Sequence, residues 1–267
     1  MIPYPGIEVV ERLAQTLHDG ARSGLLDRST LPDALPYGIA LRVQLALLRR
    51  WQDSGERLGG WKVGMTSGKA RDKFGPNVRP FGFILKSRIF RSGASIRFGD
   101  VPNAAIEPEL AFLIARPLRG GSVSEDDARN AIAGVAPAFE IQQRRIPIAE
   151  NQSLWLADDL GQWGITVGTT RPWSGTAAAT MVSLSRDDEL ATSVGPGHDI
   201  DEPILSIRNL CRALHEYGLG LDAGQYVMTG SFSYNRVEFP SRWEASFSSA
   251  GRVAMHFADT PVQRGDP

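Results

Sequence analysis

Cysteine and histidine are scarce in this sequence, and their scarcity excludes several classes of site. The chain has 267 residues but only one cysteine and four histidines. A single cysteine allows neither a disulfide within the chain nor a cysteine-rich zinc site. The histidines are scattered, and no two have the spacing of a metal-binding pair. We expect a reducing compartment, the cytoplasm.

Long apolar runs and an excess of one charge are also missing. No stretch of about 18 apolar residues occurs, so no transmembrane helix is expected. The N-terminal residues, which include Pro3, Pro5 and Glu8, do not resemble a signal peptide. A net charge of −1 gives no broad attraction to nucleic acid or to an anionic membrane. No glycine-rich phosphate loop precedes a helix, and Ser231 lacks the context of a serine-hydrolase nucleophile.

The chain does have the composition of a globular protein, with 42% hydrophobic and 22% charged residues. Apolar side chains at helical spacing, from Ile7 onward, predict an N-terminal helical segment over residues 1–58, with Gly20 as the first stop. From Trp61 short apolar runs alternate with turn residues, which predicts strands. We therefore expect a β-rich catalytic domain over 59–258 and a flexible tail over 259–267.

Few helices interrupt the predicted strands. One is expected over 124–132, where Ser124 and acidic residues form a typical N-terminus, and one over 205–217, before Gly218. This mixture favours an α+β fold over strictly alternating βαβ units. The predicted strands are 61–65, 82–85, 95–98, 106–115, 135–142, 162–168, 181–185, 225–229, 243–248 and 252–258.

Three glutamates stand in apolar, strand-like segments. Glu107 and Glu109 belong to the run 106–114, and Glu140 belongs to the run 135–141. Because side chains alternate along a strand, Glu107 and Glu109 are expected on the same face. Pro108 cannot donate to a β-ladder, so it predicts an edge strand or a bulge. A solvated strand face is the alternative interpretation of these glutamates.

If they are buried, the glutamates predict a metal site. A buried carboxylate is costly unless it is paired or bound to a cation, and neither run contains a lysine or arginine. Oxygen ligands alone suit Mg²⁺ or Mn²⁺ and not zinc. Three carboxylates with a divalent cation leave one negative charge, which a nearby lysine would neutralise.

Lys62 is the candidate for that lysine. It lies between Trp61 and Val63 in an apolar run. One interpretation is a solvated charge at a sheet edge. The other is a buried amine, whose pKa burial would lower and a neighbouring anion would raise.

Four motifs occur in order along the chain, and together they resemble one enzyme family. They are Gly60-Trp-Lys-Val-Gly-Met-Thr-Ser67, Ile106-Glu-Pro-Glu-Leu-Ala-Phe112, Pro137-Ala-Phe-Glu140 and Val227-Met-Thr-Gly-Ser231. The chain resembles the 2-hydroxypenta-2,4-dienoate hydratase/4-oxalocrotonate decarboxylase family, within the fumarylacetoacetate hydrolase superfamily. The resemblance implies a mixed, barrel-like β-roll of the fumarylacetoacetate hydrolase C-terminal-domain type, after an N-terminal helical segment.

The same resemblance implies a site and a substrate class. It implies Mg²⁺ or Mn²⁺ held by Glu107, Glu109 and Glu140, with Lys62 as the catalytic residue that transfers a proton or holds the substrate carboxylate. It also implies a small 2-oxo or 2-hydroxy-dienoic acid from the breakdown of aromatic compounds, and a homo-oligomer. The residues expected to bind substrate are Thr66, Ser67, Asp158, Thr229 and Ser231.

The chain departs from the family pattern at three places that bear on the substrate. Ahead of the late helix, a family Gly/Pro motif is replaced by Val194-Gly-Pro-Gly-His-Asp-Ile-Asp-Glu-Pro203. Related hydratases carry an aspartate just before a Phe-Gly or Tyr-Gly turn, where this chain has Pro80, preceded by Arg79. A segment that usually reads Ala-Asp-Asn is here Ala157-Asp-Asp-Leu160. These departures leave the exact substrate and the proton donor open.

Our first hypothesis is a divalent-metal-dependent hydratase, a hydro-lyase that adds water to a 2-hydroxy-2,4-dienoate to give a 4-hydroxy-2-oxo acid. The alternative is a 2-oxo-3-enedioate decarboxylase, in which Arg79 or Arg144 would meet the distal carboxylate. A third hypothesis is a non-catalytic partner subunit. The glutamates do not separate the first two reactions, since both pass through a dienolate that a metal would stabilise.

Overall fold

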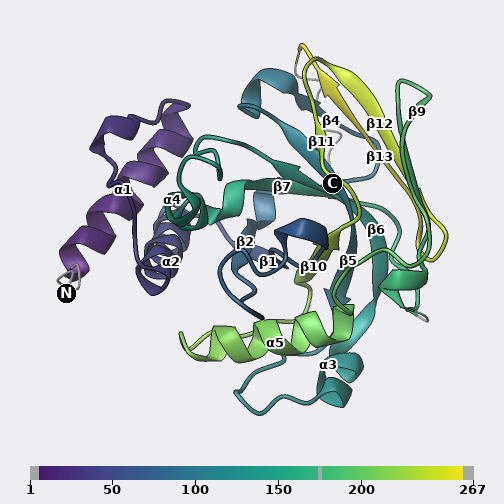
Figure 1. Ribbon diagram of the computed structural model, residues 1–267, viewed down its shortest axis with the longest axis horizontal. Helices are drawn as coiled ribbons and strands as arrows, with labels where there is room; N and C mark the ends of the chain where they lie inside the picture. Colours follow the sequence, from purple (N-terminus) through teal and green to yellow (C-terminus); the bar gives the residue numbers. More distant parts are fainter. Residues whose placement is uncertain (1–5, 174–175, 261–267) are drawn as a thin grey trace.

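The protein has the α+β architecture that the sequence predicts, and its strands form two mixed sheets (Figure 1). A computed structural model describes residues 6–173 and 176–260. Both sheets are open and end in edge strands, so the barrel-like roll is not closed. The strands are β1 Leu58–Val63, β2 Phe81–Leu85, β3 Ile89–Arg91, β4 Ala94–Arg97, β5 Ala105–Ile114, β6 Ile132–Gln142, β7 Gln162–Val167, β8 Val182–Arg186, β9 Glu189–Val194, β10 Tyr226–Ser231, β11 Asn235–Arg236, β12 Ser241–Phe247 and β13 Gly251–Ala258.

The first sheet holds the candidate site. Its strand order is β2-β1-β10-β5-β6-β7-β3, and β11 also pairs with β5. Within it β1 pairs with β10 and β3 pairs with β7 in parallel, whereas the other pairs are antiparallel. The second sheet, β4-β13-β12-β8-β9, packs on the first through contacts of β13 with β6 and β7. Apolar side chains between the sheets, such as Phe139 and Phe257, are fully buried and form part of the core.

Helices lie on two sides of this sheet (Figure 1). The helices are α1 Ile7–Ser23, α2 Tyr37–Asp53, α3 Glu125–Ala131, α4 Gln152–Ala157 and α5 Pro203–His215. Helix α1 packs on α2, α2 packs on α4, and α3 packs on α5. Helix α1 continues past Gly20 and ends at Gly24, whose φ of 74° fits the left-handed conformation that glycine adopts easily. The predicted stop at Gly20 is therefore wrong. None of the helices in the described ranges is long and apolar enough to cross a membrane.

The predicted strands all overlap observed ones, whereas β3, β9, β11 and α4 were not expected. The domain boundaries at residues 58 and 258 stay predictions. The sequence predicts a flexible tail over residues 259–267, of which residues 261–267 lie outside the described residues.

Strand β5 is an interior strand, so the edge expected from Pro108 is wrong. Strand β10 pairs with β5 as far as Glu109, and β11 pairs with β5 at Ile106. Pro108 lies between these two paired regions. The carbonyl of Pro108 accepts a hydrogen bond of 3.0 Å from the backbone N–H of Phe232. A register shift between Met228 and Ser231 marks the irregularity on β10, so the strand that faces the proline carries the bulge.

Candidate metal centre

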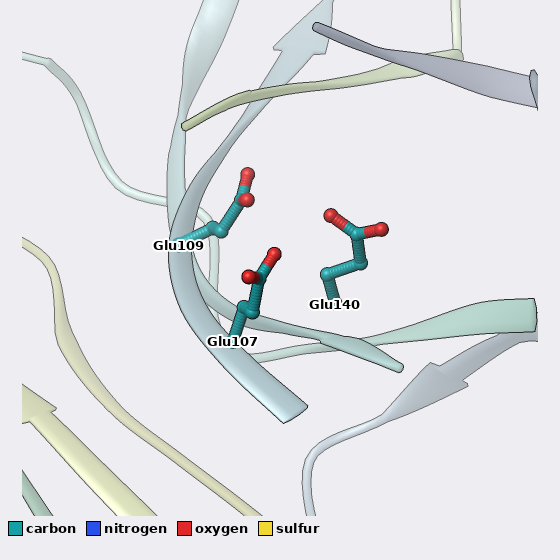
Figure 2. Close-up of side chains that lie close together, drawn as sticks. All are labelled: Glu107, Glu109 and Glu140. Carbon is teal, nitrogen blue, oxygen red and sulfur yellow. The ribbon is translucent and has the colours of Figure 1, made fainter. Parts of the chain in front are cut away.

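Three carboxylates converge at the centre of the first sheet. Glu107 and Glu109 extend from β5, and Glu140 lies directly opposite Glu107 on β6. One carboxylate oxygen of each residue lies within 4.8 Å of the other two, and Figure 2 shows the side chains pointing toward a common space. Glu109 and Glu140 are 3% and 2% exposed, and Glu107 is half-buried. The solvated-face interpretation therefore does not describe this group.

The three carboxylates repel one another. Burial is the largest cause that raises the pKa of Glu107, to about 8, and the negative charge of Glu140 adds to it. The positive charges of Lys62 and Arg144 lower this pKa but do not cancel the rise. Burial and the charges of both other glutamates raise the pKa of Glu109 well above its ordinary value. A donor set of carboxylate oxygens with surplus negative charge fits a hard divalent cation.

Two hydrogen bonds orient the carboxylates on β5. The side-chain amide of Gln142 donates to Glu107 Oε2 over 2.8 Å, and the backbone N–H of Gly230 donates to Glu109 Oε2 over 3.1 Å. Gly230 lies in the β10 bulge with a φ of 141°, and a Cβ atom there would lie 2.1 Å from Thr66 Oγ1. Only glycine fits this position, because it combines a positive φ with a close neighbour.

Lys62 is buried beside the carboxylates. Its side chain, on β1, is 4% exposed and forms an ion pair with Glu140. Its ammonium group also donates to the carbonyl of Leu160 over 3.3 Å. Burial lowers the pKa of Lys62, but the charge and hydrogen bond of Glu140, with the charges of Glu107 and Asp159, together outweigh burial, so the pKa is raised. Lys62 thus matches the buried-amine interpretation, with the proton held by neighbouring anions.

A strained turn after α4 places the carbonyl that Lys62 contacts. Asp159, Leu160 and Gly161 have φ values of 57°, 55° and 72°. Positive φ is costly for residues other than glycine and is held only where the surroundings enforce it. Here Asp159 Oδ1 accepts hydrogen bonds from the Phe83 N–H over 2.8 Å and from the Gln44 amide over 3.3 Å. These bonds fasten the turn to β2 and α2.

Two of the residues expected to bind substrate are buried beside Gly230, whose N–H contacts Glu109. Thr66 is 3% exposed and lies against Gly230, and Thr229 is 1% exposed and precedes Gly230 on β10. Ser231 donates its hydroxyl to the carbonyl of Ser233 over 3.0 Å. Ser67 pairs with Ile200 in an isolated β-bridge.

Asp158 faces a different part of the molecule. It forms a buried ion pair with Arg145, whose guanidinium also donates to the carbonyl of Leu17 in α1 over 3.1 Å. The adjacent Asp159, and not Asp158, lies near Lys62. Burial raises the pKa of Asp159, and the positive charge of Lys62 opposes this rise. The left-handed backbone begins at Asp159, which is the physical reason that these two neighbouring carboxylates meet different partners.

Gln142 and Gln44 were not predicted. Gln142 follows Glu140 by two residues on β6, so strand alternation could have placed it on the site face. Gln44 lies in α2, far from the site in sequence, and no local pattern indicates its bond to Asp159.

Comparisons with known proteins agree with this geometry. A sequence model of the fumarylacetoacetate (FAA) hydrolase C-terminal family matches residues 60–261. A 2-hydroxyhexa-2,4-dienoate hydratase of Comamonas testosteroni is 28% identical over 85% of this chain and 88% of its own length. A 4-oxalocrotonate decarboxylase of a Pseudomonas species is 27% identical over 83% of this chain and 87% of its own.

The fold is similar to that of a solved structure. The structure of 4-oxalocrotonate decarboxylase from Pseudomonas putida G7, complexed with magnesium and adipate, matches with a TM-score of 0.85. The match covers 96% of this chain and 99% of that one at 21% sequence identity. At this identity the match establishes the shared fold.

Proposed function

This chain belongs to the fumarylacetoacetate hydrolase C-terminal family, and on that premise we propose that it is a divalent-metal-dependent hydratase. The reaction is the addition of water to a 2-hydroxy-2,4-dienoate, through its 2-oxo-4-enoate form, to give a 4-hydroxy-2-oxo acid in the catabolism of aromatic compounds. The convergence of Glu107, Glu109 and Glu140 beside buried Lys62 carries the proposal. The similarity to the Comamonas testosteroni hydratase supports the choice of reaction.

Mg²⁺ or Mn²⁺ is the proposed cofactor. The three candidate ligands offer only carboxylate oxygens, which these ions prefer. The three negative charges of the glutamates, the two positive charges of the cation and the charge of Lys62 sum to zero. The Pseudomonas putida decarboxylase was solved with magnesium, which supports this choice. When bound, such a cation supplies charge that stabilises an anion at the 2-oxo oxygen of the substrate.

The chain itself supplies the positioning and the proton. Lys62 keeps its proton at Nζ, held by Glu140 and the Leu160 carbonyl, and we propose that it donates this proton or holds the substrate carboxylate. The hydroxyls of Thr66 and Thr229 are proposed to bind the substrate. Ser67, Ser231 and Asp158 stay predictions as substrate ligands.

The second candidate function is decarboxylation of a 2-oxo-3-enedioate. The 27% identity to a 4-oxalocrotonate decarboxylase favours it, and the same site would serve both reactions. A non-catalytic partner subunit is the third candidate, and the complete set of glutamates with Lys62 argues against it.

One assay separates the three candidates. The purified protein, loaded with Mn²⁺, is given 2-hydroxypenta-2,4-dienoate or 4-oxalocrotonate while ultraviolet absorbance and CO₂ are recorded. We expect loss of the dienol without CO₂. Release of CO₂ from the diacid would make the protein a decarboxylase, and no reaction with either substrate would contradict both enzyme assignments.

The carboxylate assignment is tested by Glu107→Gln, which removes one negative oxygen donor. Turnover should fall by more than about 100-fold, since even residues that only support metal ligands cost 10- to 100-fold in affinity or activity. The matched control is Glu244→Gln on β12, whose side chain is 46% exposed and 3.7 Å from Arg252. Full turnover by the Glu107 variant would refute the assignment.

We also propose a homo-oligomer in the cytoplasm. Light scattering on the purified protein would measure the subunit number, and fractionation of the producing cells would locate the chain. A monomer at all concentrations would contradict the first expectation, and enrichment in a membrane fraction would contradict the second.

A further inference from the structure

Among the residues that the structure describes, Arg144 has no acidic partner for its guanidinium. Within residues 6–173 and 176–260 it forms no ion pair and no side-chain hydrogen bond, and its Cζ lies 4.4 Å from the centroid of the Tyr234 ring. Two other arginines are committed to structure. Arg145 pairs with Asp158, and Arg79 pairs with Asp72 and Asp201. Arg144 is therefore available to a ligand, whereas Arg79, the other arginine suggested by the sequence, is occupied.

The backbone places Arg144 on the face of the sheet that carries the carboxylates. The N–H of Gln143 donates to the Gly161 carbonyl, and the N–H of Arg144 donates to Pro102 on the opposite side. Alternating N–H directions are those of an extended strand, so the side chains of Gln142 and Arg144 share one face. Gln142 contacts Glu107, and Arg144 follows about 7 Å further along the chain.

Tyr234 approaches the same place from another strand. Asn235 on β11 pairs with Ile106 on β5 in antiparallel register, so Tyr234 is the next residue toward Glu107. Burial raises the pKa of Tyr234. The positive charge of Arg144 lowers this pKa and the negative charge of Glu107 raises it, which agrees with Tyr234 lying close to both residues.

This end of the site is the more open one. Glu107 is the least buried of the three carboxylates, and Tyr234 is 39% exposed. Arg144 is half-buried, so its cation is partly shielded from water but still reachable. A substrate whose acid head lies at the glutamates and Lys62 can therefore extend its tail past Arg144 and Tyr234.

We propose that Arg144, supported by the Tyr234 ring, binds the far carboxylate of a dicarboxylic substrate. The inference rests on the proposed function and narrows its substrate class to 2-hydroxy-dienoates that carry a second carboxylate. A guanidinium presents several N–H donors in a plane and pairs with a carboxylate through two parallel hydrogen bonds. The ring holds the cation through a cation–π contact that uses none of those donors.

The kinetic test compares two acids that differ only at the far end, 2-hydroxyhexa-2,4-diene-1,6-dioate and 2-hydroxyhexa-2,4-dienoate. The wild-type protein should prefer the diacid in kcat/KM by at least about tenfold. Arg144→Gln should reduce kcat/KM for the diacid by about 10- to 100-fold and change that for the monoacid by less than about threefold. Tyr234→Leu should reduce kcat/KM for the diacid by about two- to fivefold. Arg252→Gln, at a 74% exposed arginine on β13, is the matched control and should change neither value.

A binding test separates this inference from the proposed reaction. Calorimetry on the Mg²⁺-loaded protein compares 2-oxoadipate with 2-oxohexanoate, which share the acid head and contain no double bond to hydrate. The wild-type protein should bind 2-oxoadipate at least about tenfold more tightly, and Arg144→Gln should remove the preference. If neither dienoate reacts but this preference is found, the proposed reaction fails and the carboxylate site stands. Equal binding of both acids, or an equal effect of Arg144→Gln on both, would overturn the site.

Discussion

Buried charges are arranged differently in two regions of the molecule. Beside helix α1, Arg145 meets Asp158, one cation and one anion, in a buried ion pair. At the candidate metal centre, three glutamates meet the single cation Lys62. The first arrangement is neutral within the chain, whereas the second needs charge from outside. Local imbalance of buried charge, and not burial alone, distinguishes a binding site from a structural ion pair.

Glu109→Gln should have the largest effect and act on metal binding alone. The amide keeps the shape of the side chain and one oxygen for the N–H of Gly230, but removes the charge. Affinity for Mn²⁺ should fall by more than about 100-fold. The free energy of unfolding of the metal-free protein should change by less than about 1 kcal/mol or rise, because a repulsive charge is lost.

Titration calorimetry with Mn²⁺ and urea unfolding in a chelator measure these two quantities. A Glu109 variant that binds Mn²⁺ as tightly as the wild-type protein would remove the distinction between the two regions.

Asp158→Asn replaces a carboxylate with an amide in the Arg145 region and should affect stability. It leaves the buried guanidinium of Arg145 without its anion, and breaking a buried pair costs about 3–5 kcal/mol. The affinity of the folded protein for Mn²⁺ should stay within about twofold of the wild-type value, a margin well below the 10- to 100-fold expected of residues that support a metal ligand.

Urea unfolding measures the loss, with Asp188→Asn as the control. Asp188 is 81% exposed and pairs with Arg242 at the surface, where such pairs contribute about 0–1 kcal/mol. If Asp158→Asn lost Mn²⁺ affinity without losing stability, Asp158 would belong to the site, as the sequence led us to expect.

Local patterns predict much of this fold because the core strands are short apolar runs bounded by turn residues. Strand β9 is polar and mostly exposed, and β11 has only two residues, so neither has a periodic signal. Strand order was not predictable, because the pairing of β1 with β10 joins residues that are more than 160 positions apart.

The site shows the same division between local and long-range information. Alternation along β5 predicts that Glu107 and Glu109 share a face, but the position of Glu140 opposite Glu107 depends on a register set by two separate strands. Alternation from Glu140 through Gln142 also assigns Arg144, and not Arg145, to the site face. No such rule separates Asp158 from Asp159. Three successive residues with left-handed backbone, of which only Gly161 is a glycine, decide which aspartate approaches Lys62.

Gly82→Ala tests the contact between Lys62 of the metal centre and Asp159, the residue next to Asp158. Gly82 pairs with Lys62 in the β1–β2 register. An added Cβ would lie 2.9 Å from Asp159 Oδ1 and 3.2 Å from Lys62 Cε. The contact with Asp159 is too short, so the Asp159 carboxylate must shift from the Phe83 N–H, and the tight contact with Lys62 displaces the lysine as well. Turnover should fall about tenfold, since small displacements of a catalytic group are costly. Overpacking should cost about 1–3 kcal/mol of stability.

Gly38→Ala in α2 is the matched control for this change. Nothing lies within 4 Å of a Cβ atom at Gly38, so the substitution should raise the free energy of unfolding by about 0.5–1 kcal/mol and leave turnover unchanged. Mn²⁺ affinity should change little in either variant, because neither touches a carboxylate of the metal centre. If Gly82→Ala lost stability but kept full turnover, the position of Lys62 would not limit the reaction, and the site would depend on the glutamates alone.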